Sequence, residues 1–170
     1  MSGYRLIRAV CDDLPAVRPT YVEVDLGAVA NNARVLAAAS QNKVFAVVKA
    51  DAYGHGAIPV ARRLADDGQV FGFAVSLVEE GVELREAGIS QPILVMGPSM
   101  QGGEEQLLAH SMWPMVSSLS TLRSLAVVAE EAKRALVVHL KLDTGMGRLG
   151  LSEAELVTAL DLIDDVAPLR

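Results

Sequence analysis

Short apolar runs alternate regularly with segments of helical spacing along this chain, and this alternation constrains the fold most strongly. We expect clear strands at residues 20–26, 44–50, 70–76, 92–97 and 135–144, and a weaker one at 113–118 that contains Pro114. The segments with helical spacing are 27–40, 58–67, 77–88, 103–111, 119–133 and a last one that opens at Ser152. Strands that alternate with helices through short loops are typical of parallel β/α units. The pattern therefore predicts an α/β fold with a parallel sheet.

Two architectures share this pattern: an open doubly wound sheet and a (β/α)8 barrel. A barrel needs eight strands and about 250 residues, whereas the chain has 170 residues and five clear strands. A barrel interpretation therefore implies that the chain holds only part of one. Residues 1–19 are expected to be an irregular N-terminal lead-in, and residues 20–170 form the partial barrel of about five β/α units.

Local signals predict where several helices begin and end. Asp25 is placed to cap the helix that follows it. Gly88 is expected to stop the helix over 77–88. Ser152 and Glu155 have the spacing of a capping box, and the helix they open is expected to bury Leu156, Leu160 and Ile163.

The charge and cysteine content narrow the class of partner. The net charge of −6 and the isoelectric point near 5.0 disfavour nucleic acid and anionic membranes, which would repel the chain. No apolar run approaches the roughly 18 residues of a membrane span. Cys11 is the single cysteine and has no partner for an internal disulfide, which suits a reducing compartment. We expect a cytoplasmic protein.

Several common chemical motifs are absent from the sequence. The stretch "YGHG" at 53–56 is not a G-x-G-x-x-G motif, and no Gly-Lys-Ser/Thr occurs. His55, His110 and His139 show no metal-ligand spacing with one another or with a cysteine. Neither a nucleotide site nor a metal site is therefore expected.

Lys49 lies at the end of the apolar run "VFAVVKA". Phe45, Val47 and Lys49 share one side of the expected strand, so in a barrel the lysine would project into the mouth. A neutral amine in such a place is the nucleophile that forms a Schiff base with an aldehyde or a ketone. A lysine that simply reaches into solvent from the strand end is the alternative.

A second group of charged residues lies in "HLKLDTGMGRLG", residues 139–150. His139, Lys141 and Asp143 share one side of the expected strand, and charges buried in a barrel interior require partners. Arg148 follows in a glycine-rich loop and can bind a phenolate or a carboxylate through its planar guanidinium. The alternative is a purely structural ion-pair cluster.

Two stretches, "AVVKADAYGHGA" at 46–57 and "KLDTGMGRLG" at 141–150, closely resemble the alanine racemase family of pyridoxal 5'-phosphate (PLP) enzymes. "YVEVDLGAVANNARVL" at 21–36 and "REAGISQPILVMG" at 85–97 resemble the N-terminal and middle parts of the same domain. The resemblance covers nearly the whole chain after residue 18. It implies the N-terminal part of a PLP-binding (β/α)8 barrel of fold type III.

The resemblance assigns roles to five residues. Lys49 is the lysine that holds PLP as a Schiff base and serves as a base on one face of the substrate. Tyr53 contacts the cofactor phosphate, and Met96 is an apolar residue near the cofactor. Arg148 lies near the phenolic oxygen of the cofactor and binds the substrate carboxylate. Lys141 corresponds to a lysine that is carbamylated in many relatives, where it orients that arginine.

By the same resemblance, the activity is interconversion of L- and D-alanine, which supplies D-alanine for peptidoglycan. Racemisation needs a second acid/base on the opposite face, which the family takes from a tyrosine of the partner subunit in a homodimer. Further barrel strands and a β domain would follow residue 170, so we expect this chain alone to be inactive. The alternatives are a broad-specificity amino-acid racemase, a D-threonine aldolase-like enzyme, a small PLP-binding barrel protein without racemase activity, and a non-catalytic interaction module.

Overall fold

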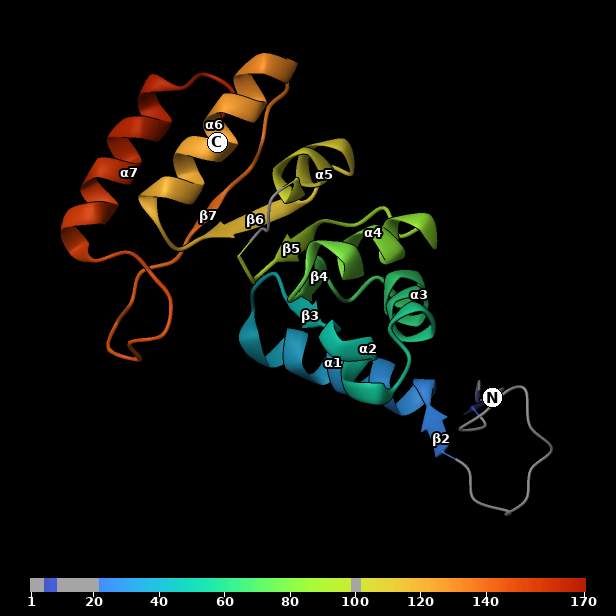
Figure 1. Cartoon of the computed structure of the whole chain (residues 1–170). Coiled ribbons are helices and arrows are strands. Elements are labelled where there is room, and N and C mark those ends of the chain that lie inside the picture. The colour runs from blue at the N-terminus through green and yellow to red at the C-terminus, as the bar shows by residue number, and fades with distance from the viewer. Residues whose placement is uncertain (1–4, 9–21, 99–101) are drawn as a thin grey trace.

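The computed structural model describes residues 5–8, 22–98 and 102–170, and its centre is a five-stranded parallel sheet. The strands are β3 (Phe45–Val47), β4 (Gly72–Val75), β5 (Ile93–Val95), β6 (Trp113–Val116) and β7 (His139–Leu140). They lie side by side in chain order (Figure 1). A doubly wound sheet reverses its strand order at a switch point, whereas a barrel keeps chain order. The order therefore confirms the partial-barrel architecture.

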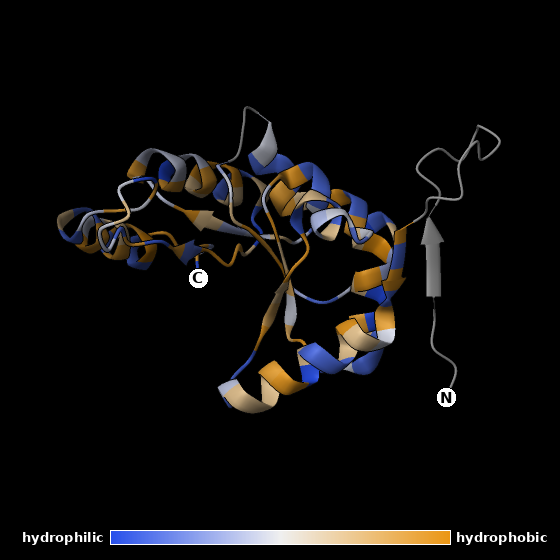
Figure 2. Ribbon diagram, turned by 90° about the horizontal axis from the view of Figure 1, so that it is seen from below, coloured by the Kyte–Doolittle hydropathy of each residue, from blue (hydrophilic) through white to orange (hydrophobic). Residues whose placement is uncertain are grey.

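Helices line the sheet in the same order as the strands. They are α1 (Leu26–Ser40), α3 (Ala57–Asp67), α4 (Val78–Glu86), α5 (Gly103–Ala109), α6 (Leu119–Ala132) and α7 (Glu153–Asp165). Each of these helices packs against the next along the chain. In Figure 2 the central strands are largely hydrophobic, while most helices mix hydrophobic and hydrophilic residues. This contrast fits strands in the interior and helices with one face in solvent.

The first predicted strand lies outside the parallel sheet. β2 (Val22–Asp25) pairs antiparallel with β1 (Arg5–Arg8) in a separate two-stranded sheet. Only Val24 of β2 is buried, and such alternation is typical of an antiparallel strand with one covered face. β1 also falls within residues 1–19, which were expected to be irregular. Cys11 and residues 9–19 lie outside the described residues.

The sheet has one face buried beneath the helices and one face that is more open. Phe73, Ile93 and Val116 are fully buried on the helix side. The strand registers place eight residues on the opposite side, here called the inner face: Phe45, Val47, Gly72, Ala74, Leu94, Trp113, Met115 and His139. Val47 is 42% exposed, Gly72 and Ala74 are buried, and the other five are half-buried. The inner face corresponds to the interior of a barrel.

Aromatic rings gather at the amino ends of the strands on the inner face. The centroids of the Phe45 and Phe71 rings are 5.3 Å apart, and the Trp113 ring stacks on His139 at 5.4 Å. Burial lowers the pKa of His139. This end of the inner face is therefore largely apolar.

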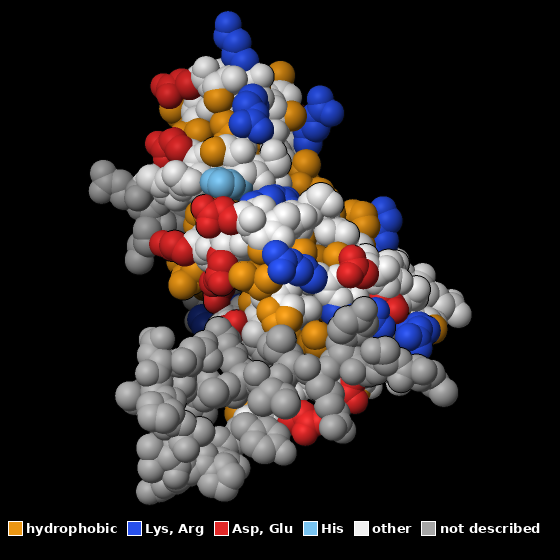
Figure 3. Space-filling view, turned by 90° about the vertical axis from the view of Figure 1, so that its right-hand side faces the viewer, with side chains coloured by type: hydrophobic (Ala, Val, Ile, Leu, Met, Phe, Trp, Pro, Cys, Tyr) orange, Lys and Arg blue, Asp and Glu red, His pale blue; other side chains and the backbone are white. Residues whose placement is uncertain are grey.

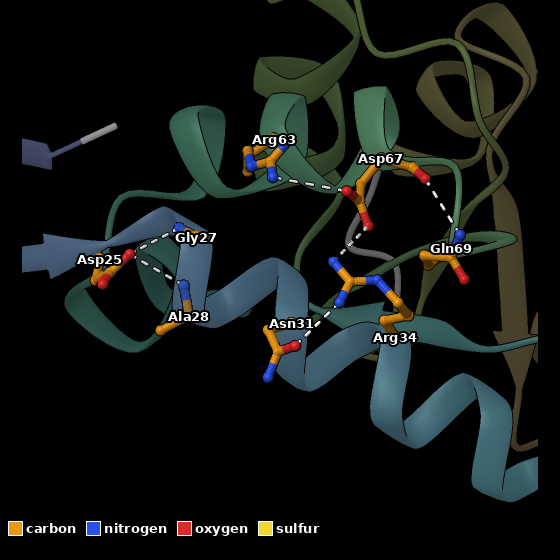
Figure 4. A network of polar contacts seen from close by, with 8 residues as sticks. All are labelled: Asp25, Gly27, Ala28, Asn31, Arg34, Arg63, Asp67 and Gln69. Carbon is orange, nitrogen blue, oxygen red and sulfur yellow. Dashed lines mark hydrogen bonds and ion pairs between the residues drawn. The ribbon is translucent and has the colours of Figure 1, made fainter. Parts of the chain in front are cut away.

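The predicted helix ends are confirmed, but part of one predicted helix face is wrong. Asp25 accepts hydrogen bonds from the amides of Gly27 (2.8 Å) and Ala28 (3.0 Å) at the start of α1 (Figure 4). Ser152 and Glu155 form the predicted capping box at the start of α7. Leu160 of α7, expected to be buried, is 50% exposed. Of the described helices α7 packs mainly against α6, and this leaves its other flank in solvent.

An ion-pair network joins α1 to α3. The Asp67 carboxylate lies 3.6 Å from the guanidinium of Arg63 and 3.9 Å from that of Arg34 (Figure 4). Arg34 also donates to the Asn31 side chain at 3.0 Å. Nearby, an apolar pocket of about 340 Å³ lies between α1, β3 and α3. Lys49 does not line this pocket.

The face shown in Figure 3 carries acidic and basic side chains interspersed with small hydrophobic patches. Charges of both signs therefore occur side by side on this face. Within the described residues, no helix combines the length and hydrophobicity required to cross a membrane.

Candidate active site at the carboxyl ends of the strands

The chain reverses its handedness immediately after β3. The strand ends at Val47, earlier than the predicted residue 50, and Lys49 opens the short segment α2 (Lys49–Gly54). Ala50, Asp51, Ala52 and Tyr53 have φ angles of 50°, 53°, 52° and 56°, so α2 is one left-handed turn. Each L-residue in this conformation costs about 1–2 kcal/mol. A turn with this strain persists only where its surroundings hold it.

Hydrogen bonds within the segment offset part of that strain. The Asp51 side chain accepts from the Ala57 amide at 2.7 Å and so caps α3. The Asp51 carbonyl accepts from the Gly56 amide, and the Val48 carbonyl accepts from the Ala52 amide, both at 2.9 Å. The turn is thus tied to β3 on one side and to α3 on the other.

A contact with α4 holds the turn from a third direction. The Glu80 carboxylate accepts from the Ala50 amide at 2.6 Å through Oε1. Its Oε2 accepts from the amides of Ser76 (2.7 Å) and Leu77 (3.0 Å), at the end of β4. The sequence interpretation missed Glu80. Its position as the third residue of a helix, after Leu77, is the signal that could have suggested a capping role.

The turn brings Lys49 and Tyr53 to the same side of the molecule. The Lys49 Nζ atom lies 6.0 Å from the centroid of the Tyr53 ring. Lys49 is half-buried and continues the inner face past Val47, whereas Tyr53 is 61% exposed. Lys49 forms no hydrogen bond or ion pair through its side chain with the described residues. Its amine is therefore open to a ligand from the barrel mouth.

Met96 lies at the carboxyl end of β5, on the same edge of the sheet. Its amide donates to the Val75 carbonyl at 2.8 Å, and its side chain is half-buried. Gly97 follows, and its amide donates to Ser76 at 3.0 Å. A Cβ atom at Gly97 would collide with the Ser76 carbonyl oxygen, so this approach of the two strand ends requires glycine.

The loop after β7 is closed by backbone pairing. The predicted strand 135–144 is much shorter than expected, since β7 spans only His139–Leu140. Leu151 donates to the Lys141 carbonyl at 2.7 Å and accepts from the Asp143 amide at 3.0 Å. As expected, Gly145, Gly147 and Gly150 all adopt positive φ. Arg148 lies in this closed loop with an exposed side chain.

Asp143 is satisfied by backbone amides and not by a cation. Its Oδ1 accepts from the amides of Gly145 and Gly147, both at 3.0 Å. The hydrogen bond from Gly147, then that from Gly145, lowers the pKa of Asp143 below 3.8, and the charge of Lys141 adds a smaller effect. No hydrogen bond or ion pair in the described chain joins the Lys141 amine to the Asp143 carboxylate. The expectation of a deeply buried, paired charge row is therefore corrected.

The lowered pKa of Asp143 predicts an acid transition confined to this loop. The carboxylate stabilises the folded loop fully above about pH 4, the usual aspartate range, and this stabilisation is lost as the pH falls through the lower folded pKa. We expect the Gly145 and Gly147 amide resonances to shift together in that window when followed by NMR. Asp143→Asn keeps an acceptor oxygen but no titration, so its spectra should lack the transition. A transition that persists in Asp143→Asn would contradict the assignment.

The five predicted site residues thus lie along one edge of the sheet, but they are not all in contact. The structure brings Lys49 and Tyr53 together. Lys49 follows β3, and Lys141 follows β7, which are the two outer strands of the sheet. In a closed barrel such outer strands face each other across the mouth. The described residues include no group of three or more His, Cys, Asp or Glu side chains suited to a metal ion.

Comparison with known proteins relates this geometry to one family. Residues 24–170 match the family model described as "Alanine racemase, N-terminal domain". The chain is 44% identical over 152 residues to the alanine racemase of Sorangium cellulosum. The aligned stretch covers 85% of this chain and 40% of that protein. The chain therefore spans about two fifths of the length of such relatives.

Solved structures show the same relationship. The alanine racemase of the D-cycloserine producer Streptomyces lavendulae superposes with a TM-score of 0.79 at 34% identity, over 85% of this chain and 39% of that one. The histidine racemase of Leuconostoc mesenteroides superposes with a TM-score of 0.77 at 26% identity, over 85% and 39% of the two chains. Two amino-acid substrates thus occur among proteins with this arrangement of strands and helices.

Proposed function

The chain belongs to the alanine racemase family, whose N-terminal domain it matches over residues 24–170, and from this premise we propose that it holds pyridoxal 5'-phosphate covalently on Lys49. We propose further that it supplies the cofactor-bearing part of an enzyme that interconverts L- and D-alanine. One observation carries the proposal: the half-buried residue Lys49 lies at the carboxyl end of β3, on a turn held from three sides.

The donor set suits an aldehyde-bearing, anionic cofactor. The amine of Lys49 is the group that can bond to the aldehyde, and the phenol of Tyr53 can donate a hydrogen bond to a phosphate oxygen. Met96 offers an apolar contact two strands away. Arg148 can pair with a phenolate or carboxylate through its planar fork. These residue types match the aldehyde, phosphate, ring and phenolic oxygen of PLP.

The bound cofactor supplies an electron sink that acidifies the Cα–H bond of an amino acid. Lys49 is then placed to remove or return the Cα proton at its Nζ atom on one face of the substrate. Racemisation needs a second proton carrier on the opposite face. We propose that this is a tyrosine of the partner subunit in a homodimer, as the family resemblance implies.

The loop after β7 is proposed to orient the substrate. Arg148 would bind the substrate carboxylate and the phenolic oxygen of the cofactor, with the loop backbone ordered by Asp143. Lys141 would orient Arg148, and carbamylation of Lys141 would give it the negative charge needed for that pairing. D-alanine for peptidoglycan, made in the cytoplasm, is the corresponding cellular role.

A broad-specificity racemase is the second candidate function. The histidine racemase of Leuconostoc mesenteroides shares the fold at 26% identity, so the fold accommodates more than one substrate side chain. Our preference for alanine rests on the 44% identity to an alanine racemase. A panel of amino acids tested for exchange of the Cα proton in D2O, with the full-length protein, would separate the two.

Covalent labelling tests the cofactor proposal directly. The purified chain is incubated with PLP, reduced with borohydride and digested with trypsin. Because a modified lysine resists cleavage, we expect the label on one peptide spanning residues 44–62. Labelling without Cα exchange of alanine is the result expected of the 170-residue chain, because the second proton carrier is proposed to be a tyrosine that this stretch does not supply. Absence of the labelled peptide would contradict the proposal.

A further inference from the structure

The Glu80 carboxylate joins two strand ends that are distant in sequence. Its Oε1 accepts from the Ala50 amide across 30 positions, at 2.6 Å. Its Oε2 accepts from Ser76 and Leu77 at the end of β4. Both oxygens of one half-buried side chain are thereby committed to three backbone donors. Hydrogen bonds to a charged acceptor are the stronger kind.

We propose that Glu80 is a positioning residue that fixes the left-handed turn carrying Lys49 and so sets the direction of its Nζ atom. Ala50 is the residue directly after Lys49, and its φ of 50° lies in the strained left-handed region. The bond from its amide to Glu80 therefore constrains the backbone at the point where the handedness changes. The structural part of this proposal, that Glu80 holds the turn, does not depend on the function of Lys49. Its chemical consequence, the direction of Nζ toward the cofactor, rests on the proposed function.

A purely local role for Glu80 is the competing explanation. Glutamate as the third residue of a helix commonly accepts from the backbone just before the helix, and the Leu77 contact is of this kind. Such a cap requires no contact with α2. The Ala50 contact, made by the other oxygen, is what a local cap does not explain.

Hydrogen exchange in the 170-residue chain separates these explanations without any cofactor. In Glu80→Gln one acceptor oxygen becomes an NH2 donor, so we expect the Ala50 amide to exchange at least tenfold faster. Glu80→Asp keeps the charge at the helix start but is one methylene shorter. We expect it to retain protection at Leu77 and to lose protection at Ala50. Glu79→Gln removes an exposed charge from the same helical turn and should change neither amide.

Binding of PLP supplies the second readout. We expect Glu80→Gln and Glu80→Asp to weaken covalent attachment at Lys49 about tenfold in a titration of visible absorbance, with urea midpoints used to correct for stability. Unchanged Ala50 exchange in both variants would overturn the proposal. Faster Ala50 exchange with unchanged attachment would also overturn it, because the turn would then not control Lys49. If the parent chain fails to bind PLP, the proposed function fails, while the exchange result still decides whether Glu80 holds the turn.

Discussion

Replacing Lys49 with alanine is expected to abolish covalent attachment of PLP and the visible absorbance that accompanies it. The change removes the amine at the carboxyl end of β3. Among the described residues at the carboxyl ends of the strands, the other lysine is Lys141, which follows β7, four strands away. The expected loss is complete and not partial, because no other side chain on the turn is a primary amine. Absorbance after addition of PLP, followed by borohydride reduction and mass spectrometry, measures it.

Two control variants make this result specific. Lys49→Arg retains a positive charge, but a guanidinium does not condense with the aldehyde, so it should also fail to bind covalently. Lys43→Ala removes a nearby lysine, whose Nζ atom lies 4.4 Å from the centroid of the Phe71 ring, and should leave the absorbance unchanged. Persistent covalent labelling of Lys49→Ala, on a peptide that carries another lysine, would show that the wrong amine has been assigned.

Replacing Arg85 with alanine is expected to lower the free energy of unfolding by about 2–4 kcal/mol, because several carbonyls lose a charged donor. The Arg85 guanidinium donates to the carbonyls of Ile89 and Gln91, both at 2.7 Å. It also donates to His110 at 2.9 Å and Ser111 at 3.2 Å. These contacts hold the end of α4, the loop before β5 and the connection between α5 and β6. Water can replace some of them, so the estimate lies below the sum of four charged bonds.

Urea denaturation followed by circular dichroism measures this loss. Arg85→Lys keeps the positive charge, but its single ammonium group cannot reach all the carbonyls that the three guanidinium nitrogens contact. We therefore expect an intermediate loss of unfolding free energy. Arg123→Ala removes an exposed arginine of α6 and should change the free energy by less than about 0.5 kcal/mol. A loss below about 0.5 kcal/mol for Arg85→Ala would mean that the four contacts contribute nothing net to stability.

Features governed by neighbouring residues were predictable from the sequence. The Asp25 cap and the Ser152–Glu155 capping box depend on atoms within three positions of each other, and both are observed. The parallel pairing of the strands follows from repeated β/α alternation, whereas that alternation alone left the strand order open between two architectures. Pro114 weakened the prediction for 113–118, but β6 still pairs with β5, because a missing amide removes only one bond from a parallel ladder.

Features that depend on distant residues were not predictable in the same way. The four left-handed residues after Lys49 include no glycine, so no local signal announced the turn. Glu80 and Arg85 act on atoms 25 or more positions away, and their periodicity marked them only as polar helix residues. The roles of Lys49, Tyr53, Met96, Lys141 and Arg148 remain predictions, although the structure supports their placement along one edge.

The chain-order arrangement of the sheet also bears on how the protein forms. Leu94 pairs with Trp113 only 19 positions later, and Phe45 pairs with Gly72 only 27 positions later. Short separations keep the entropy of loop closure small. During synthesis, each β/α unit can therefore dock on the one before it as soon as it leaves the ribosome. The turn that carries Lys49 would be clamped once α4 has emerged, well before Arg148 is made.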